Sequence, residues 1–209
     1  MTSTRAAGIP GTTTVVLVRH ALPVSGVTRD PGLSPEGEAQ ARRAGHWLRW
    51  ESPAGVLASP YRRAAETAEW IAKACDLAVE LDDDLREWNA PRPQQYITPE
   101  MLGSSERGRA FAEGRFAEFV PPHDRAELRA RMTNAVRRAV QRWLGATVVL
   151  VSHGGAINSL MSAVLSVPET FFFNPGYTSL CRIQVMADGR MVPVTVNETG
   201  HLVATRTHR

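Results

Sequence analysis

An α/β fold, with a mostly parallel β-sheet between two layers of helices, is predicted by three features of the sequence. Short apolar runs alternate with longer stretches in which apolar residues recur at helical spacing, as in successive β-α-β units. One run, Val15 to Val18, is β-branched and lacks polar alternation, which indicates a strand buried on both faces. A second run, within Ala146 to Gly155, has the same character, and a histidine stands shortly after each of the two runs. Strands of this kind are typical of a three-layer α/β/α sandwich.

The first half of the chain contains three predicted strands and two predicted helices. Ser34 is expected to cap the first helix, because a proline follows at the first helical position. Ser59, which is also followed by a proline, is expected to cap the second helix. The predicted elements are a strand over 15–18, a helix from Ser34 to 51–53, a strand over 55–58, a helix from Ser59 to about Ala74 and a strand over 77–81.

The second half continues the alternation after an interruption. Residues 88–122 lack a strand pattern and contain several prolines, so they are predicted to be a helical insertion on a single domain that spans 1–209. Residues 1–11 hold two glycines and a proline and are predicted to be a flexible tail. The remaining predicted elements are helices over 125–144 and 156–167 and strands over 146–152, 178–186 and 191–197.

Composition and charge narrow the class of protein. The chain has 209 residues, of which 43% are hydrophobic, enough for a sizeable core. The formal net charge is only +3 and no basic run carries aromatic residues, so nucleic-acid binding is not expected. No stretch has the length of a membrane span, and the first residues lack the apolar segment of a signal peptide. The sequence therefore predicts a cytoplasmic protein that binds neither nucleic acid nor membrane, and it leaves a homodimer open.

Two predicted strands end in residues suited to bind an oxyanion. Arg19 and His20 follow the first strand, and His153 follows the strand over 146–152. Because ligands lie at the carboxyl ends of parallel strands, these side chains are expected to meet at one edge of the sheet. A guanidinium group offers a planar set of donors to an oxyanion, and an imidazole can act as a nucleophile or a base.

Five short motifs follow one another along the chain. They are LVRHA at Leu17, LSPEGEAQA at Leu33, SPYRRAAETA at Ser59, LRE at Leu85 and VSHGG at Val151. In this order they resemble the histidine phosphatase superfamily, which includes the cofactor-dependent phosphoglycerate mutases. The resemblance covers most of 15–185 and implies a phosphoglycerate mutase-like fold.

The resemblance implies a reaction through a phosphohistidine. His20 would attack phosphorus and divide one difficult displacement into two easier ones. The phosphoryl oxygens would be bound by side chains and by backbone N–H groups where a helix begins. These phosphate-binding residues would be Arg19, Arg63, His153 and Gly154.

Glu87 matches the acid of the family. It would protonate the leaving oxygen and later take a proton from water. Asp82, Asp83 and Asp84 are nearby acids, although an acidic cluster after a strand is more often a solvated loop. Arg63 also has a neighbour of the same type, Arg62, and the register of the motif favours Arg63.

Departures from the mutases favour hydrolysis over transfer. Ala21 replaces the glycine after the nucleophilic histidine, Gly26 stands where mutases have asparagine, and 88–92 lacks their lysine. We expect a metal-independent phosphatase of the histidine acid phosphatase type, with a small phosphorylated substrate and no cofactor. Two alternatives remain: a cofactor-dependent phosphotransferase of the mutase type, and a non-catalytic phosphate-binding pseudoenzyme.

The remaining histidines, cysteines and tryptophans are assigned no chemistry. The cysteines, Cys75 and Cys181, are far apart and show no metal-ligand spacing, so no metal site is expected. Histidines outside the motifs are expected at the surface, and tryptophans at helical spacing are expected in the core. These are His46, His123, His201 and His208, and Trp47, Trp50, Trp70 and Trp143.

Overall fold

The computed structural model contains one six-stranded sheet in the order β3-β2-β4-β1-β5-β6. It describes residues 11–25, 30–87, 105–106, 109–110, 113, 115 and 122–203. The strands are β1 (Thr13–Arg19), β2 (Gly55–Ala58), β3 (Val79–Leu81), β4 (Thr147–Ser152), β5 (Leu180–Val185) and β6 (Met191–Glu198). The helices are α1 (Pro35–Leu48), α2 (Arg62–Cys75), α4 (Pro122–Arg142) and α5 (Gly154–Val164), with short 3-10 helices η1 (Arg49–Glu51), η2 (Asp83–Leu85) and η5 (Gly200–Leu202).

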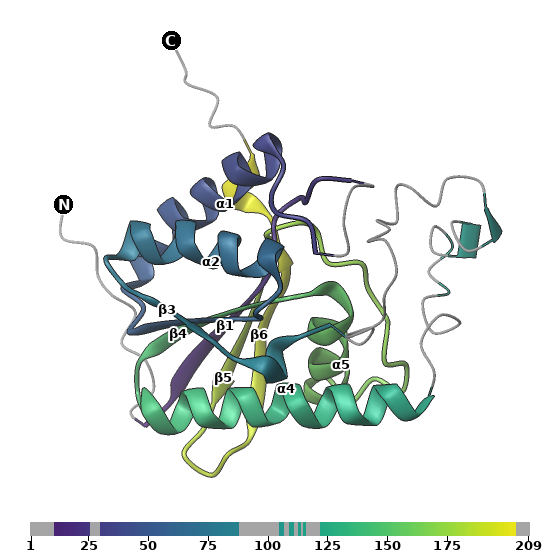
Figure 1. Ribbon diagram of the computed structural model, residues 1–209. Helices are drawn as coiled ribbons and strands as arrows, with labels where there is room; N and C mark the ends of the chain where they lie inside the picture. The colour runs from purple at the N-terminus through teal and green to yellow at the C-terminus, as the bar shows by residue number, and fades with distance from the viewer. Residues whose placement is uncertain are drawn as a thin grey trace.

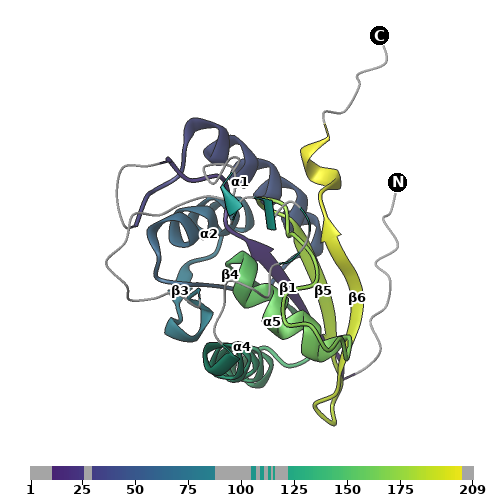
Figure 2. The same ribbon diagram turned by 90° about the vertical axis from the view of Figure 1, so that its right-hand side faces the viewer.

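Helices cover both faces of the sheet, which confirms the predicted three-layer sandwich. Helices α1 and α2 lie on one face and α4 and α5 on the other (Figure 1). Strands β3, β2, β4 and β1 are parallel, whereas β5 pairs antiparallel with β1, and β6 pairs antiparallel with β5. The view along α4 shows the same layers from the side (Figure 2).

The unbroken apolar character of β1 follows from burial on both faces. Val15 and Leu17 pack in the cluster that includes α4 and α5, whereas Val16 and Val18 pack in the cluster beneath α1 and α2. All four side chains are 0% exposed. Because each buried aliphatic side chain contributes about 1.5–3 kcal/mol, β1 is fixed firmly at the centre of the sheet.

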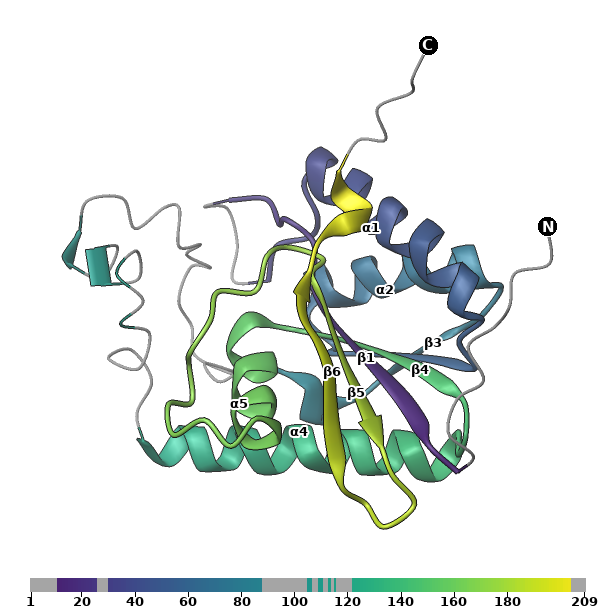
Figure 3. The same cartoon turned by 180° about the vertical axis from the view of Figure 1, so that it is seen from behind.

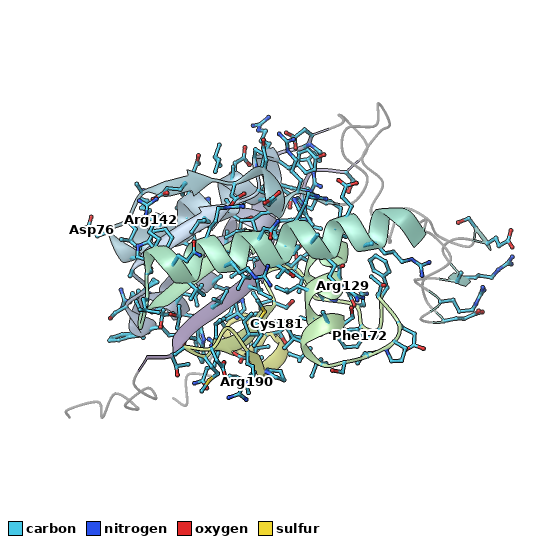
Figure 4. All side chains as sticks on the ribbon, turned by 90° about the horizontal axis from the view of Figure 1, so that it is seen from below. Asp76, Arg129, Arg142, Phe172, Cys181 and Arg190 are labelled. Carbon is cyan, nitrogen blue, oxygen red and sulfur yellow. The ribbon has the colours of Figure 1, made fainter. Side chains whose placement is uncertain are left out.

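On the α4 side, α5 also holds the loop that precedes β5. Asn158 of α5 accepts hydrogen bonds from the backbone N–H groups of Phe172 and Phe173. Arg129 of α4 donates to Ser162 of α5, and Figure 4 shows Arg129 and Phe172 at this end of the molecule. The segment that leads to β5 is therefore attached to the helix that begins beside His153.

The start of α1 is as the sequence predicts. Ser34 is the N-cap, its Oγ accepts a hydrogen bond from the Gly37 N–H at 3.0 Å, and Pro35 opens the helix. A Cβ atom at Gly37 would lie 2.0 Å from the carbonyl oxygen of Leu22. A glycine is therefore required where the loop after β1 crosses the helix.

The predicted cap of α2 was wrong. This helix begins at Arg62, and its N-cap is Tyr61, which makes no capping bond through its side chain. Ser59 lies before the helix, and its hydroxyl contacts the ring of His153 instead.

Other element boundaries also differ from the prediction. Strand β3 begins at Val79 rather than Leu77, because the Leu77 N–H closes the end of α2 on the Ala72 carbonyl. Helix α5 begins two residues earlier than predicted, at Gly154, and ends at Val164. Helix α4 ends at Arg142.

Burial of the aromatic residues and histidines differs from the prediction in three places. Trp47 is 46% exposed and Trp50 is 75% exposed, whereas Trp70 and Trp143 pack against the core. Trp50 is exposed because α1 ends before it, so the helical spacing no longer applies. His201, expected at the surface, is buried.

Part of the prediction concerns residues that the structure does not describe. The predicted tail lies outside the described residues except for position 11, and the insertion over 88–122 does so for the most part. Gly26, the 88–92 segment and His208 also lie outside them, as does the side chain of His123. Within the described ranges, no helix is long and apolar enough to cross a membrane.

Candidate active site

The two histidines that follow apolar strands lie side by side. Strands β1 and β4 are parallel neighbours, with Arg19 opposite Ser152, so the next residue of each strand emerges at the same edge. The rings of His20 and His153 have centroids 5.1 Å apart and are tilted by 59°. Both are buried, at 2% and 0% exposed.

The hydrogen bonds of His20 define its tautomer. Its Nδ1 lies 2.8 Å from the carbonyl oxygen of Ala21, which can only accept, so Nδ1 carries the proton. Its Nε2 accepts from Nε of Arg63 at 3.3 Å. Burial holds the pKa of His20 well below its usual value of 6.5, and the charges of Arg63 and Arg19 lower that pKa further. His20 is therefore neutral at neutral pH, with a lone pair on Nε2.

Helix α2 places one arginine of its first turn in the site and the other at the surface. Arg63 is 3% exposed, and its Nη1 lies 3.6 Å from a carboxylate oxygen of Asp30. The side chain of Arg62 is 66% exposed and pairs with Glu66 at 2.6 Å. The structure thus brings Arg63, and not Arg62, to His20.

Arg19 lies beneath the start of α5 and is held by the segment before β5. Its guanidinium carbon lies 4.0 Å from the ring centroid of Tyr177, and its Nη1 donates to the carbonyl of Pro175. Its Nε is buried and has no hydrogen-bond partner among the described residues. A Cβ atom at Gly154 would lie 3.7 Å from this Nε, so the glycine leaves the space above it open.

His153 is the N-cap residue of α5 and contacts Ser59. Its Nε2 lies 2.8 Å from the Ser59 hydroxyl, and its Nδ1 is buried with no partner in the described part of the chain. Burial lowers the pKa of His153 well below 6.5, and the charge of Arg63 adds to this. A neutral ring with Nε2 accepting from Ser59 would carry its proton on Nδ1.

Glu87 is held at the start of α5. Its Oε2 accepts a hydrogen bond from the Gly155 N–H at 2.9 Å, close to His153. Arg131 of α4 fixes the preceding backbone by donating to the carbonyls of Asp84 and Arg86, each at 3.2 Å.

The neighbouring acids of Glu87 form ion pairs elsewhere. Asp82 and Asp84 both pair with Arg138 of α4, at 2.8 and 2.7 Å. Asp83 pairs with Arg86 at 2.7 Å. Glu87 is the acid of this segment that the structure places at the start of α5.

Two tyrosines that the sequence interpretation missed flank the histidines. Tyr61 stands edge-on to His153, with ring centroids 5.3 Å apart, and its own ring lies 4.9 Å from the Arg63 guanidinium carbon. Tyr177 lies on the other side, 5.8 Å from the His20 ring. Burial raises the pKa of Tyr61, so its hydroxyl stays protonated at neutral pH. Its position inside the SPYRR motif was the available signal, whereas Tyr177 lies in none of the five motifs.

Among the described residues, no three His, Cys, Asp or Glu side chains are grouped as a metal site would require. The site is instead built from two arginines and two histidines, with the carboxylates of Glu87 and Asp30 beside them. This donor set suits an oxyanion.

Comparison with known proteins links this geometry to one family. A family model described as histidine phosphatase superfamily (branch 1) matches residues 15–199. The probable phosphoglycerate mutase GpmB of Yersinia enterocolitica is 33% identical over 171 residues, which cover 74% of this chain and 75% of that protein.

Two solved structures share the fold over most of the chain. A mycobacterial glucosyl-3-phosphoglycerate phosphatase, solved with VO3, has a TM-score of 0.73 and 25% identity, covering 89% of this chain and 99% of that one. YhfR of Bacillus stearothermophilus has a TM-score of 0.74 and 25% identity, covering 91% and 100%.

Proposed function

Because this chain belongs to the histidine phosphatase superfamily, we propose that it hydrolyses phosphomonoesters through a phosphohistidine at His20. The observation that carries the proposal is the tautomer of His20. The Ala21 carbonyl holds the proton on Nδ1, so the lone pair of Nε2 lies next to the Arg63 guanidinium. A neutral nucleophile beside such a donor can attack the phosphorus of an anion that the donor binds.

The atoms without partners support a phosphoryl-binding role for Arg19 and His153. A buried polar group without a hydrogen bond costs about 1–3 kcal/mol. Arg19 Nε and His153 Nδ1 are two such atoms within the described residues, and both flank His20. Phosphoryl oxygens would accept hydrogen bonds from them, and the N-terminus of α5, which begins at Gly154, adds a favourable dipole.

The proposed reaction has two steps, phosphorylation of His20 and hydrolysis of the phosphohistidine. In the first, Nε2 of His20 forms a bond to phosphorus, the bond to the ester oxygen breaks, and Glu87 gives its proton to that oxygen. In the second, water attacks the phosphohistidine, Glu87 takes a proton from the water, and the P–N bond breaks. Inorganic phosphate leaves, and both residues return to their initial states.

The competing function is phosphoryl transfer of the mutase type. The name of the Yersinia relative favours it, whereas the absence of lysine in 88–92 favours hydrolysis. Assay of a phosphorylated metabolite panel with and without a bisphosphorylated cofactor separates the two. Release of inorganic phosphate indicates hydrolysis, and an isomerised product that keeps its phosphate indicates a mutase.

The substrate is proposed to be a small phosphorylated molecule. Tyr61 and Tyr177 flank the histidines and offer aromatic surface next to the phosphoryl position. The cytoplasmic location expected from the sequence stays a prediction, as does the homodimer that it leaves open.

Activity is expected to be independent of metal ions. The guanidinium groups of Arg19 and Arg63 supply the positive charge that a metal would otherwise provide. Turnover of p-nitrophenyl phosphate after exhaustive treatment with EDTA should equal that of untreated protein. Loss of turnover that magnesium or zinc restores would contradict this mechanism.

Arg63→Ala is expected to reduce kcat/KM by about 10² to 10³, because it removes a buried donor beside the nucleophile. Arg62→Ala is the matched control, since the adjacent arginine is exposed and pairs with Glu66. It should remain within about threefold of wild type. Steady-state kinetics on one phosphate ester compare the two, and equal effects would show that Arg63 does not act on the phosphoryl group.

A further inference from the structure

His201 is a buried histidine that the proposed reaction does not use. It lies in η5, which follows β6 near the C-terminal end of the chain (Figure 3). It is 9% exposed, and its Nε2 lies 3.1 Å from the hydroxyl of Thr178. Thr178 belongs to the segment just before β5, which packs against the end of β1.

The hydrogen-bond directions show which group donates. The Thr178 hydroxyl donates to the carbonyl of Tyr177 at 2.7 Å. Having used its proton there, the hydroxyl accepts from His201, so Nε2 of His201 carries a proton. The other nitrogen, Nδ1, is buried and has no partner among the described residues. His201 therefore acts as a donor to Thr178.

Thr178 occupies a conformation that favours glycine. It is the third residue of a turn that the Ser179 N–H closes on the Gly176 carbonyl at 3.0 Å, and its φ is +56°. A β-branched residue is strained in this region. Such strain persists where the surroundings fix the backbone, and it is common next to functional sites. The hydroxyl, which a glycine would lack, accounts for a threonine at this position.

The turn contacts the phosphate site in two ways. The Thr178 N–H donates to the carbonyls of Arg19 and His20, at 3.1 and 3.4 Å. The preceding residue, Tyr177, places its ring 4.0 Å from the Arg19 guanidinium carbon. A shift of this turn would move the backbone of the nucleophile and the aromatic surface against which Arg19 lies.

We propose that His201 is a positioning residue of the phosphate site. By donating to the Thr178 hydroxyl it holds the strained turn, and the turn sets the orientation of Arg19 and the place of His20. The inference takes from the proposed function only the identity of the ligand, an inorganic phosphate or phosphoryl group. It assigns a role in this site to the C-terminal η5, which none of the five motifs includes.

Two substitutions separate this role from simple packing. His201→Gln keeps an N–H donor near the position of Nε2, whereas His201→Phe fills similar space without a donor. We expect His201→Phe to weaken inorganic phosphate binding about tenfold, the effect of one hydrogen bond, and to raise KM for p-nitrophenyl phosphate in proportion. His201→Gln should stay within about threefold of wild type. Calorimetric titration with phosphate and steady-state kinetics measure both.

The control variant is Arg43→Ala, because Arg43 donates a hydrogen bond to η5 at the carbonyl of Leu202, at 3.5 Å, rather than to the Thr178 hydroxyl. It should leave phosphate affinity unchanged. Wild-type affinity in His201→Phe, or equal losses in the Phe and Gln variants, would overturn the proposal.

Substitutions at Thr178 provide a second test, in which the Thr178 single variants do not depend on His201→Phe being folded. Thr178→Val removes the hydroxyl and keeps the branched shape, so it should weaken phosphate binding as His201→Phe does, and the two losses should not add. Thr178→Gly relieves the backbone strain and should melt no lower than Thr178→Val, yet bind phosphate as weakly. Additive losses, or normal binding by Thr178→Gly, would contradict the proposed coupling.

The phosphate titration separates this inference from the proposed function. If the variants bind phosphate as expected here but the wild type releases no phosphate from esters, the phosphatase is refuted and the positioning role of His201 stands. If the wild type turns over esters but every variant binds phosphate as the wild type does, the positioning role is refuted and the phosphatase stands.

Discussion

Replacing His20 with alanine is expected to reduce phosphatase activity to background and to abolish the covalent phosphoprotein. In the proposed reaction, Nε2 of His20 is the atom that bonds to phosphorus, and the other imidazole of the described site, His153, does not present its Nε2 in the same way. The His153 ring instead has its Nε2 against the Ser59 hydroxyl. Rapid acid-free quenching during turnover of p-nitrophenyl phosphate, followed by intact mass spectrometry and peptide mapping, should locate the phosphoryl group on His20 in the wild type.

The matched control is His46→Ala, because His46 is an exposed histidine on α1. It should keep full activity. His20→Ala should still bind inorganic phosphate, since Arg19, Arg63 and His153 remain. Phosphate found on a serine, or substantial turnover by His20→Ala, would exclude the assigned nucleophile. A wild type that binds phosphate without any turnover would indicate the pseudoenzyme.

The centre of the fold could be predicted because local patterns determine it. The apolar run of β1 has no polar alternation, and the structure covers both of its faces with helices. The start of α1 depends on a bond between Ser34 and Gly37, three residues apart, so the sequence carries it directly. The parallel pairing of β1 with β4 then brings His20 and His153 together.

Other features depend on partners that are distant in the sequence. Ser59 resembles a helix cap, but its hydroxyl contacts His153, which lies on another strand end. His201 has no motif around it and is buried only because β6 returns the chain to the turn before β5. Tyr177 likewise reaches Arg19 through a distant partner, because β5, which follows Tyr177, pairs with β1. No local pattern could have indicated these contacts.

The arginines of α2 show where a motif adds to local reasoning. Helical spacing alone does not decide whether Arg62 or Arg63 faces the sheet, because neither side chain is apolar. The alignment of the SPYRR segment with the family selected Arg63, and the structure places Arg63 at 3% exposure beside His20.

Glu87→Gln is expected to slow hydrolysis by an amount that depends on the leaving group. The glutamine oxygen can still accept the hydrogen bond from the Gly155 N–H, so the start of α5 should be preserved. The amide cannot donate or take the required proton, a contribution of about 10² to 10⁴ in rate. An alkyl phosphate, whose alkoxide leaves poorly without a proton, should show the full loss. Phosphorylation of His20 by p-nitrophenyl phosphate should change little, because its phenolate is a good leaving group.

The same substitution should also slow the attack of water on the phosphohistidine. With p-nitrophenyl phosphate, Glu87→Gln should therefore accumulate more acid-labile, base-stable phosphoprotein than the wild type. Asp83→Asn is the matched control, because this neighbouring side chain is 73% exposed and pairs with Arg86, and it should leave both rates unchanged. Rapid quenching with mass spectrometry measures the intermediate, and single-turnover kinetics on the two esters measure the leaving-group effect. Equal impairment on both esters without accumulation of phosphoprotein would remove Glu87 from the acid–base role, since a residue that acts only through folding would slow every substrate alike.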